Sequence, residues 1–188
     1  HVIVLMFENR SLDNMLGWLY DPANKPPFDK VPPGQSFDGV SGKKLSNPVP
    51  PYAPGSDPGA DPRVVPVGKG KVMTDPNPDP GETYCQVNTQ IYGVVDPPKN
   101  RYKPFDHRPY NLPSPLPPEA PMDGFVTDYV NNFAATEGRV PDHDEYEIIM
   151  DCYTPEDVPV ISALANAYAV CDGWYSSVPA ETFPNRSF

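Results

Sequence analysis

The chain has few basic residues for its size. Lys and Arg number 14 against 25 Asp and Glu among 188 residues, and the formal net charge at pH 7 is −11. This balance argues against a nucleic-acid backbone as the partner, because the surface would repel it. A phosphate substrate stays open, since a bound metal ion or one well-placed Arg can outweigh the global field locally.

Long hydrophobic runs are also missing. Apolar residues make up only 38% of the chain, and no stretch approaches the roughly 20 apolar residues that cross a bilayer. The run at the start of the chain, Val2–Phe7, is far too short for that. The sequence therefore predicts no transmembrane segment and leaves peripheral contact with a membrane open.

Cysteine and histidine are scarce. Three cysteines, Cys85, Cys152 and Cys171, follow no metal-binding spacing, and one would stay unpaired if the other two formed a disulfide. We interpret all three as buried thiols, which leaves the cellular compartment open. His107 lies in a Pro-rich loop and His143 in an acidic stretch, so both are expected to be exposed.

Proline, by contrast, is abundant. The 29 prolines concentrate between Pro22 and Pro121, and this span is therefore predicted to be mostly loop rather than sheet. We expect two loop-rich insertions, residues 22–81 and 94–121, with a helix over Glu82–Tyr92 between them.

Strand and helix signals alternate at the start of the chain. Val2–Phe7 is a continuous apolar run that predicts a buried parallel strand, and Ala169–Cys171 predicts a second short core strand. Ser11 can cap a short helix over Leu12–Tyr20. Strand, polar turn and helix begin a βα unit, and open α/β sheets bind ligands at the carboxyl ends of such strands.

Three more helices follow from apolar spacing. The helix over Glu82–Tyr92 should stop at Gly93. Asp123 can cap the second of these helices. Pro159 should begin the third, because proline is tolerated in the first turn. The apolar faces of these last two helices would carry Phe125, Val126, Tyr129 and Val130, and Ile161, Leu164, Ala165 and Tyr168, respectively.

Glu8 and Asn9 directly follow the first predicted strand. On the dipeptide alone, a helix-capping turn is the expected role, because Asn caps helices and Glu favours a helix N-terminus. At the end of an apolar strand, a metal or phosphate site becomes a competing interpretation. Carboxylate and amide oxygens suit a hard divalent cation.

Thr182 stands at the start of the final predicted helix, two residues before Pro184. One interpretation is an N-cap alone. The other is a nucleophile, since a hydroxyl held at a helix N-terminus and against a metal can be deprotonated and attack phosphorus. Asn185 and Arg186 follow in the first turn. Arg can clamp phosphoryl oxygens bidentately, although a solvated surface Arg is the commoner case. A cation at Asp142–Glu145 is also conceivable, but a solvated acidic turn is the expected structure there.

Five blocks, in order along the whole chain, resemble the signatures of one phosphoesterase family. That family contains bacterial phosphatidylcholine-preferring phospholipases C, plant non-specific phospholipases C and related acid phosphatases. In the first block, Leu12 and Asn14 replace the usual Phe and His of E-N-R-S-F-D-H-x-x-G, and the last block resembles S-V-P-G-P-T-x-P-N-R. The blocks are Glu8–Gly17, Asp79–Gln86, Met122–Val126, Tyr153–Asp172 and Ser177–Arg186.

The resemblance implies an α/β fold: an alkaline-phosphatase-like sandwich with a central, largely parallel sheet and, here, long Pro-rich loops. Residues 1–188 would form the N-terminal part of a single catalytic domain, with the C-terminal part and its further acidic residues and histidines missing. The resemblance implies Glu8, Asn9 and Thr182 as metal ligands, Thr182 as the nucleophile, and catalytic roles for Asn185 and Arg186. Glu82 stands where the family often has a phosphate-binding His, so a carboxylate at this possible substrate-site position would either change substrate choice or repel an anion.

The implied function is metal-assisted hydrolysis of phosphoric ester bonds, phospholipase C-like, through a covalent phospho-threonine. A phospholipid or another phosphoester would be the substrate, and a divalent metal ion of open identity the cofactor. A soluble acid phosphomonoesterase is the alternative. A second alternative is a non-catalytic anion- or phospholipid-binding fragment, or an inactive truncated one. The resemblance allows a secreted or periplasmic location, and the oligomeric state stays open.

Overall fold

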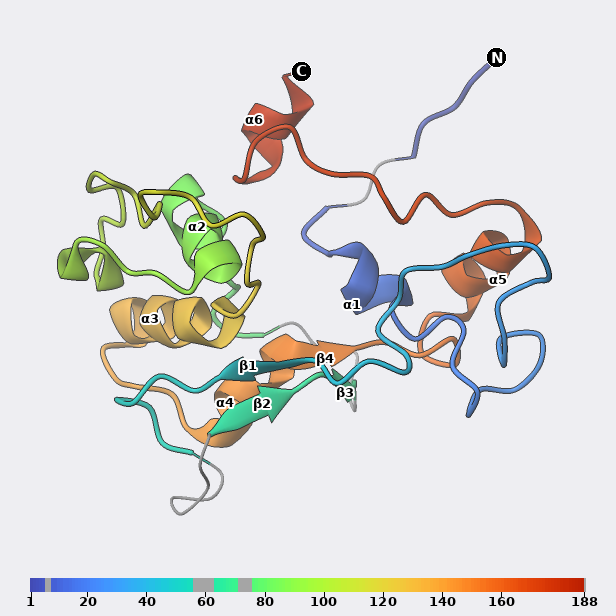
Figure 1. The fold of residues 1–188 in the computed structure, drawn as a ribbon, viewed down its shortest axis with the longest axis horizontal. Coiled ribbons are helices and arrows are strands. Elements are labelled where there is room, and N and C mark those ends of the chain that lie inside the picture. Colours follow the sequence, from blue (N-terminus) through green and yellow to red (C-terminus); the bar gives the residue numbers. More distant parts are fainter. Residues whose placement is uncertain (6–7, 56–62, 71–75, 188) are drawn as a thin grey trace. The chain divides into compact units, whose positions relative to one another are not determined.

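The computed structural model describes residues 1–5, 8–55, 63–70 and 76–187, and the chain divides into two compact units (Figure 1). Unit 1 consists of His1–Lys43, Lys69–Lys71 and Cys152–Tyr175. Unit 2 consists of Lys44–Gly68, Val72–Asp151 and Ser176–Phe188. Each unit therefore joins segments that are far apart in the sequence.

Helices and strands are mixed, and the strands are short. Unit 1 holds helices α1 (Leu12–Leu16) and α5 (Pro159–Ala167). Unit 2 holds helices α2 (Tyr84–Tyr92), α3 (Phe125–Glu137), α4 (His143–Glu147) and α6 (Thr182–Arg186), and the 3-10 helices η1 (Pro98–Arg101) and η2 (Ile148–Met150). The strands are β1 (Ser46–Pro48), β2 (Val64–Pro66), β3 (Gly68–Lys69) and β4 (Asp151–Cys152).

The strands form two small sheets. Strands β1 and β2 pair antiparallel with Asn47 opposite Val65, and β3 pairs with β4. Such a structure is consistent with the α/β class. The central, largely parallel sheet of an alkaline-phosphatase-like sandwich stays a prediction.

The two predicted core strands are absent from the described residues. Residues 2–5 and 169–171 belong to no strand, and Met6 and Phe7 lie outside the described residues. Val2 is 91% exposed and Ile3 is 92% exposed. A buried strand needs neighbouring strands that pair with its N–H and C=O groups. Across the described ranges no strand runs beside either segment.

Helix α3 carries the core of unit 2, and its apolar face was predicted. Val126, Tyr129 and Val130 are buried, and Phe125 packs against the same cluster. The other core side chains come from the β1–β2 region, α3 itself, α4 and η2: Val49, Ala53, Val65, Phe133, Tyr146 and Met150. Apolar side chains at helical spacing therefore do hold this unit together.

The start of helix α3 differs from the prediction. Gly124, not Asp123, is the N-cap, and it makes no capping side-chain bond. The Asn47 side chain instead accepts a hydrogen bond from the Phe125 N–H at 2.7 Å. A Cβ at Gly124 would lie 1.7 Å from the carbonyl oxygen of Thr89 on α2. Glycine is required because α3 begins in contact with the backbone of α2.

Helix α2 ends at Gly93 as predicted, with φ 65° at that glycine. A capping box between Thr83 and Gln86 begins the helix. Its buried residues are Cys85, Gln86, Asn88 and Thr89. Figure 1 shows α2 lying beside α3. The interface between these two helices is therefore largely polar.

In unit 1 the predicted starts of both helices are confirmed, but the predicted buried face of α5 is not. Ser11 caps α1 by accepting a bond from the Asn14 N–H at 3.1 Å, although α1 ends at Leu16 instead of Tyr20. Helix α5 begins at Pro159 as predicted. Leu164 is 54% exposed and Tyr168 is 82% exposed, so the predicted buried face of α5 is wrong. Periodicity identifies the residues that share a face, but not whether anything covers that face.

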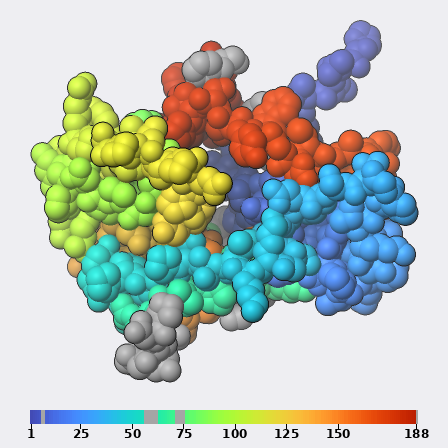
Figure 2. Space-filling view, viewed as in Figure 1, coloured from blue at the N-terminus to red at the C-terminus, as the bar shows by residue number. Residues whose placement is uncertain are grey.

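The described parts of the two Pro-rich stretches contain little regular structure. Within the described parts of residues 22–81 and 94–121, only the short strands β1 to β3 and the helix η1 are regular. The loop between α2 and α3, yellow-green to yellow in Figure 2, covers much of the visible face of unit 2. One cysteine prediction is wrong: Cys85 and Cys152 are buried, but Cys171 is exposed. No helix of the described residues has the length and apolarity to cross a membrane.

Candidate functional site

Thr182 opens helix α6 as its first helical residue. The N-cap is Glu181, which makes no capping side-chain bond, so Thr182 is not the cap that one interpretation expected. Thr182 is half-buried, and its neighbours Glu181 and Phe183 are exposed. Helix α6 is a single turn of five residues. The dipole of so short a helix therefore adds little positive electrostatic potential at Thr182.

The Asn185 side chain fastens the loop before Thr182. Its Oδ1 accepts from the Val178 N–H at 2.9 Å. Its Nδ2 donates to three carbonyl oxygens of the same loop, at 2.9 Å to Val178, 2.9 Å to Ala180 and 3.1 Å to Glu181. The amide of Asn185 is fully engaged by backbone, so it holds the loop that presents Thr182.

Glu8 and Asn9 lie in unit 1, and both are exposed. Asn9 has φ 62°, the left-handed conformation that Asn tolerates better than most residues. The turn after it packs within unit 1: the Arg10 guanidinium lies 5.8 Å from the Tyr153 ring centroid. The Tyr153 N–H also donates to the Asn14 carbonyl at 2.7 Å. The first and fourth sequence blocks thus meet in space.

The second block is held against helix α3, whose first residues end the third block. The Asn132 side chain of α3 donates to the Asp79 carbonyl at 2.7 Å. Gln90 Nε2 donates to the Gly81 carbonyl at 2.6 Å and to Asp128 Oδ2 at 2.8 Å. The segment that ends next to Glu82 is therefore fixed against α3. Glu82 itself is exposed and directly precedes the Thr83 N-cap of α2.

Asp128 is a buried acid that sequence reasoning missed. It is 3% exposed, and burial raises the pKa of its carboxyl to about 7, although bonds from Gln90 and the Gly81 N–H oppose the rise. The signal in the sequence was the polar pair Asp128 and Asn132, one helical turn apart in a helix that also carries Val126, Tyr129 and Val130. Such spacing marks a polar stripe, but not its burial.

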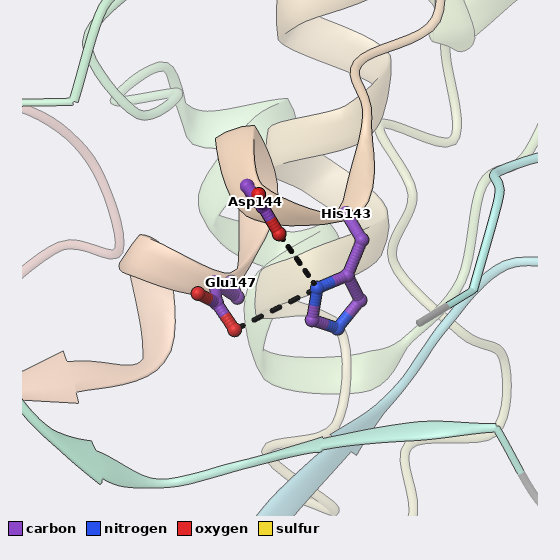
Figure 3. Close-up of side chains that lie close together, drawn as sticks. All are labelled: His143, Asp144 and Glu147. Carbon is purple, nitrogen blue, oxygen red and sulfur yellow. Dashed lines mark ion pairs between the residues drawn. The ribbon is translucent and has the colours of Figure 1, made fainter. Parts of the chain in front are cut away.

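Helix α4 brings together His143, Asp144 and Glu147 (Figure 3). His143 Nδ1 lies 3.5 Å from Asp144 Oδ1 and 3.6 Å from Glu147 Oε2. The His143 side chain is 20% exposed, so the prediction of an exposed His is wrong. One nitrogen and two carboxylate ligands within 4.8 Å of one another could hold a metal ion.

The rest of the acidic stretch has other partners. Glu145 closes the capping box of α4 with Asp142 and accepts two hydrogen bonds from Arg139, at 2.7 and 2.5 Å. The Arg139 bond lowers the pKa of Glu145 to about 2. The cation site that the sequence suggested at Asp142–Glu145 is thus reduced to His143 and Asp144, together with Glu147.

The predicted site residues form two groups. Thr182, Asn185 and Arg186 lie together on α6 in unit 2, which also contains Glu82, whereas Glu8 and Asn9 belong to unit 1. Their convergence on one metal stays a prediction. The donor set itself fits a hard divalent cation, because a carboxylate, an amide oxygen and a hydroxyl are all oxygen ligands.

The model of the phosphoesterase family matches residues 1–188, and the chain belongs to that family. Among curated proteins it is similar to non-specific phospholipase C3 of Arabidopsis thaliana, with 33% identity over 189 residues that cover 100% of this chain and 28% of the relative.

Two further relatives extend the similarity. Non-specific phospholipase C4 of Arabidopsis thaliana is 30% identical over 187 residues, and phospholipase C B of Mycobacterium tuberculosis is 24% identical over 188. Each alignment covers 100% of this chain and 28% of the relative. The chain thus spans less than a third of the length of these proteins.

Proposed function

We propose that this chain is part of a phospholipase C-like hydrolase of phosphoric ester bonds, with Thr182 as the nucleophile. Family membership over residues 1–188 carries the proposal. The Asn185 bonds to Val178, Ala180 and Glu181 support it, because they fix the backbone that leads into Thr182. We place these residues in the N-terminal part of a single catalytic domain, and the isolated chain should be inactive.

The first chemical step forms a bond between Thr182 Oγ1 and phosphorus. The hydroxyl gives up its proton, the bond from phosphorus to the diacylglycerol oxygen breaks, and that oxygen takes a proton. A phospho-threonine that still carries the headgroup remains. Water then attacks phosphorus, the bond to Oγ1 breaks, Oγ1 takes a proton from the water, and a phosphorylated headgroup leaves. No oxidant or reductant is needed.

Glu8, Asn9 and the Thr182 hydroxyl would hold the divalent cation, by their positions in the two motifs. When bound, such an ion lowers the pKa of a coordinated hydroxyl and neutralises phosphate charge. Arg186, in the last turn of α6, is the proposed clamp for phosphoryl oxygens. For Asn185 the hydrogen bonds favour a positioning role over direct contact with substrate.

The test is a set of substitutions in the full-length protein. Thr182→Val should reduce cleavage of a phosphatidylcholine analogue by at least about 1,000-fold, since the nucleophile is gone, and Thr182→Ser should retain part of the rate. Trapping after a short reaction with wild type should give a phosphorylated peptide that contains Thr182. Glu8→Gln should weaken metal affinity first, with the rate partly restored by excess metal.

The control is Thr136→Val, because Thr136 is an exposed residue of α3 whose hydroxyl accepts a bond from Lys103 at 3.0 Å. This variant should keep the wild-type rate. A Thr182→Val enzyme as fast as wild type on both the lipid analogue and a soluble aryl phosphate would end the proposal. Cleavage of the aryl phosphate alone would identify a phosphomonoesterase, and cleavage of neither by wild type a non-catalytic protein.

A further inference from the structure

Unit 2 contains an open cavity of about 340 Å³ that is separate from the residues of α6. Residues 48–52, which follow from β1, form one wall, and these include three prolines and Val49. Val95, Arg101 and Thr127 line the remainder. The cavity therefore combines an apolar wall with the guanidinium of Arg101 and the side chains of Tyr52 and Thr127, which is the composition of a site for a small ligand.

The Arg101 guanidinium is stacked on an aromatic ring. Its Cζ lies 3.6 Å from the ring centroid of Tyr52. Stacking occupies one face of the planar group, and the N–H donors point outward along its edge. The second ring contact, with Tyr102, is longer at 5.9 Å. The edge of Arg101 is thus left to bind an acceptor.

That edge has no acceptor within the part of the chain that the structure describes. Arg101 makes no hydrogen bond or ion pair there, and its Nε is buried without a partner. A buried N–H without a partner is unfavourable, because it has lost its hydrogen bond to water. In a chain with 25 acidic residues against 14 basic ones, an arginine without a carboxylate is unexpected. Because Nε is closed off from solvent, a ligand oxygen in the cavity would bind the Nη groups of Arg101.

The surroundings hold Arg101 in place. It ends η1, whose preceding residue, Asn100, donates to the carbonyls of Asp96 and His107 at 3.0 and 2.8 Å. Tyr52 is fixed as well, because its hydroxyl donates to Asn131 Oδ1 at 2.8 Å. Guanidinium and ring are therefore positioned before a ligand arrives, which lowers the entropy cost of binding.

We propose that this cavity binds a small molecule with an oxyanion on an apolar stem. The oxyanion, a phosphate or a carboxylate, would accept two hydrogen bonds from the two Nη groups of Arg101. The Thr127 hydroxyl, which has no hydrogen bond within the described residues, lines the same cavity as a further donor. The stem would pack on Pro48, Val49 and Pro50. This inference does not depend on the proposed hydrolytic function.

The experiment is a titration of the full-length protein, followed by calorimetry and by the NMR signal of Arg101 Nε–H. Phenylphosphonate and phenylacetate are the two oxyanion probes, inorganic phosphate lacks the stem, and benzyl alcohol lacks the charge. We expect saturable binding of at least one oxyanion probe with a shift of the Arg101 signal. Inorganic phosphate should bind at least tenfold more weakly, and benzyl alcohol should leave the signal unmoved.

Variants separate this cavity from the rest of the protein. Arg101→Lys should weaken binding at least tenfold, because Lys cannot offer two parallel donors, and Thr127→Val should weaken it less. Arg108→Met is the matched control, since Arg108 is exposed and lies 6.0 Å from the Tyr110 ring, and Thr182→Val should keep the affinity of wild type. Absence of saturable binding to wild type, an unmoved Arg101 signal, or unchanged affinity in Arg101→Lys would each overturn the proposal.

Discussion

At the scale of single residues, Asp128 is the most unusual group in the described chain. It belongs to the α2–α3 interface, where a carboxylate is surrounded by amide side chains and not by a cation. Gln90 and the Gly81 N–H supply hydrogen bonds, but burial still raises the pKa of Asp128 to about 7. The folded protein therefore holds a proton that the unfolded chain releases near pH 4.

This proton predicts a pH dependence of stability. The folded pKa is above the unfolded value, so Asp128 binds more protons in the folded state between about pH 4 and pH 7. The free energy of unfolding should fall as pH rises through that window, by on the order of 4 kcal/mol from this group, and level off above it. Asp128→Asn removes the titration, so its stability should change less between pH 4 and pH 8. Urea unfolding at a series of pH values measures both.

The control for this prediction is Asp106→Asn, since Asp106 is exposed in the loop between α2 and α3. Its stability curve should run parallel to that of wild type. A wild-type curve that rises from pH 4 to pH 7, with Asp128→Asn following it, would show that Asp128 is ionised throughout this range.

At the scale of elements, α3 begins in close contact with α2: a Cβ at Gly124 would lie 1.7 Å from the carbonyl oxygen of Thr89. We expect Gly124→Ala to destabilise the protein by about 1–3 kcal/mol, because the methyl group would overlap the Thr89 carbonyl oxygen and push the helices apart. Gly124 has φ −105°, which Ala adopts without strain. The loss would therefore be steric, and urea unfolding measures it.

Gly173→Ala provides the comparison, because a Cβ at Gly173 would meet nothing within 4 Å. Its free energy of unfolding should lie within about 0.5 kcal/mol of wild type. If Gly124→Ala were equally mild, the two helices would be free to separate at this point, and the close packing described for α3 would be wrong.

Several helix ends were predictable from the sequence, whereas the strands were not, and of the two predicted apolar faces only that of α3 is buried. Ser11, Gly93 and Pro159 act on their own helix termini, so their chemistry can be recognised without knowing the fold. A strand needs partners, and Val2–Leu5 has none among the described residues. The cap of α3 comes from Asn47, 78 residues away in sequence, and local reasoning assigned it to Asp123 instead.

The candidate site was likewise predictable from the sequence only in part. The motifs identified Thr182, Asn185 and Arg186 as one group because they are adjacent in sequence, and α6 does bring them together. The hydrogen bonds of Asn185 and the burial of Asp128 depend on which backbone or helix lies opposite. Arg101 gave no signal in the sequence, because neither the Tyr52 ring nor the missing carboxylate partner can be recognised before folding.

At the scale of the whole molecule, the two units differ in how much apolar surface they bury. The hydrophobic cluster of nine buried residues lies entirely in unit 2. Unit 1 exposes large apolar side chains: Val2, Ile3, Val4, Leu5, Val160, Leu164, Tyr168, Trp174 and Tyr175. Buried apolar area is the main source of stability, so unit 1 should be the less stable of the two.

This difference can be tested with the intrinsic probes of the chain. Both tryptophans, Trp18 and Trp174, lie in unit 1, whereas the long helices α2 and α3, which dominate the helical circular dichroism, lie in unit 2. On heating residues 1–188, tryptophan fluorescence should change at a lower temperature than the helical signal. Coincident transitions would show one cooperative unit and contradict the prediction.

The bonds of Asn185 reach back only seven residues, to Val178. The local shape of the turn that carries Thr182 is thus stabilised by hydrogen bonds within one short stretch of chain. These bonds involve no distant segment. A reactive group presented in this self-contained way can be kept while the walls around it diverge. If Thr182 is the nucleophile, as proposed, relatives that share this turn could accept different esters without a change in the turn that presents it.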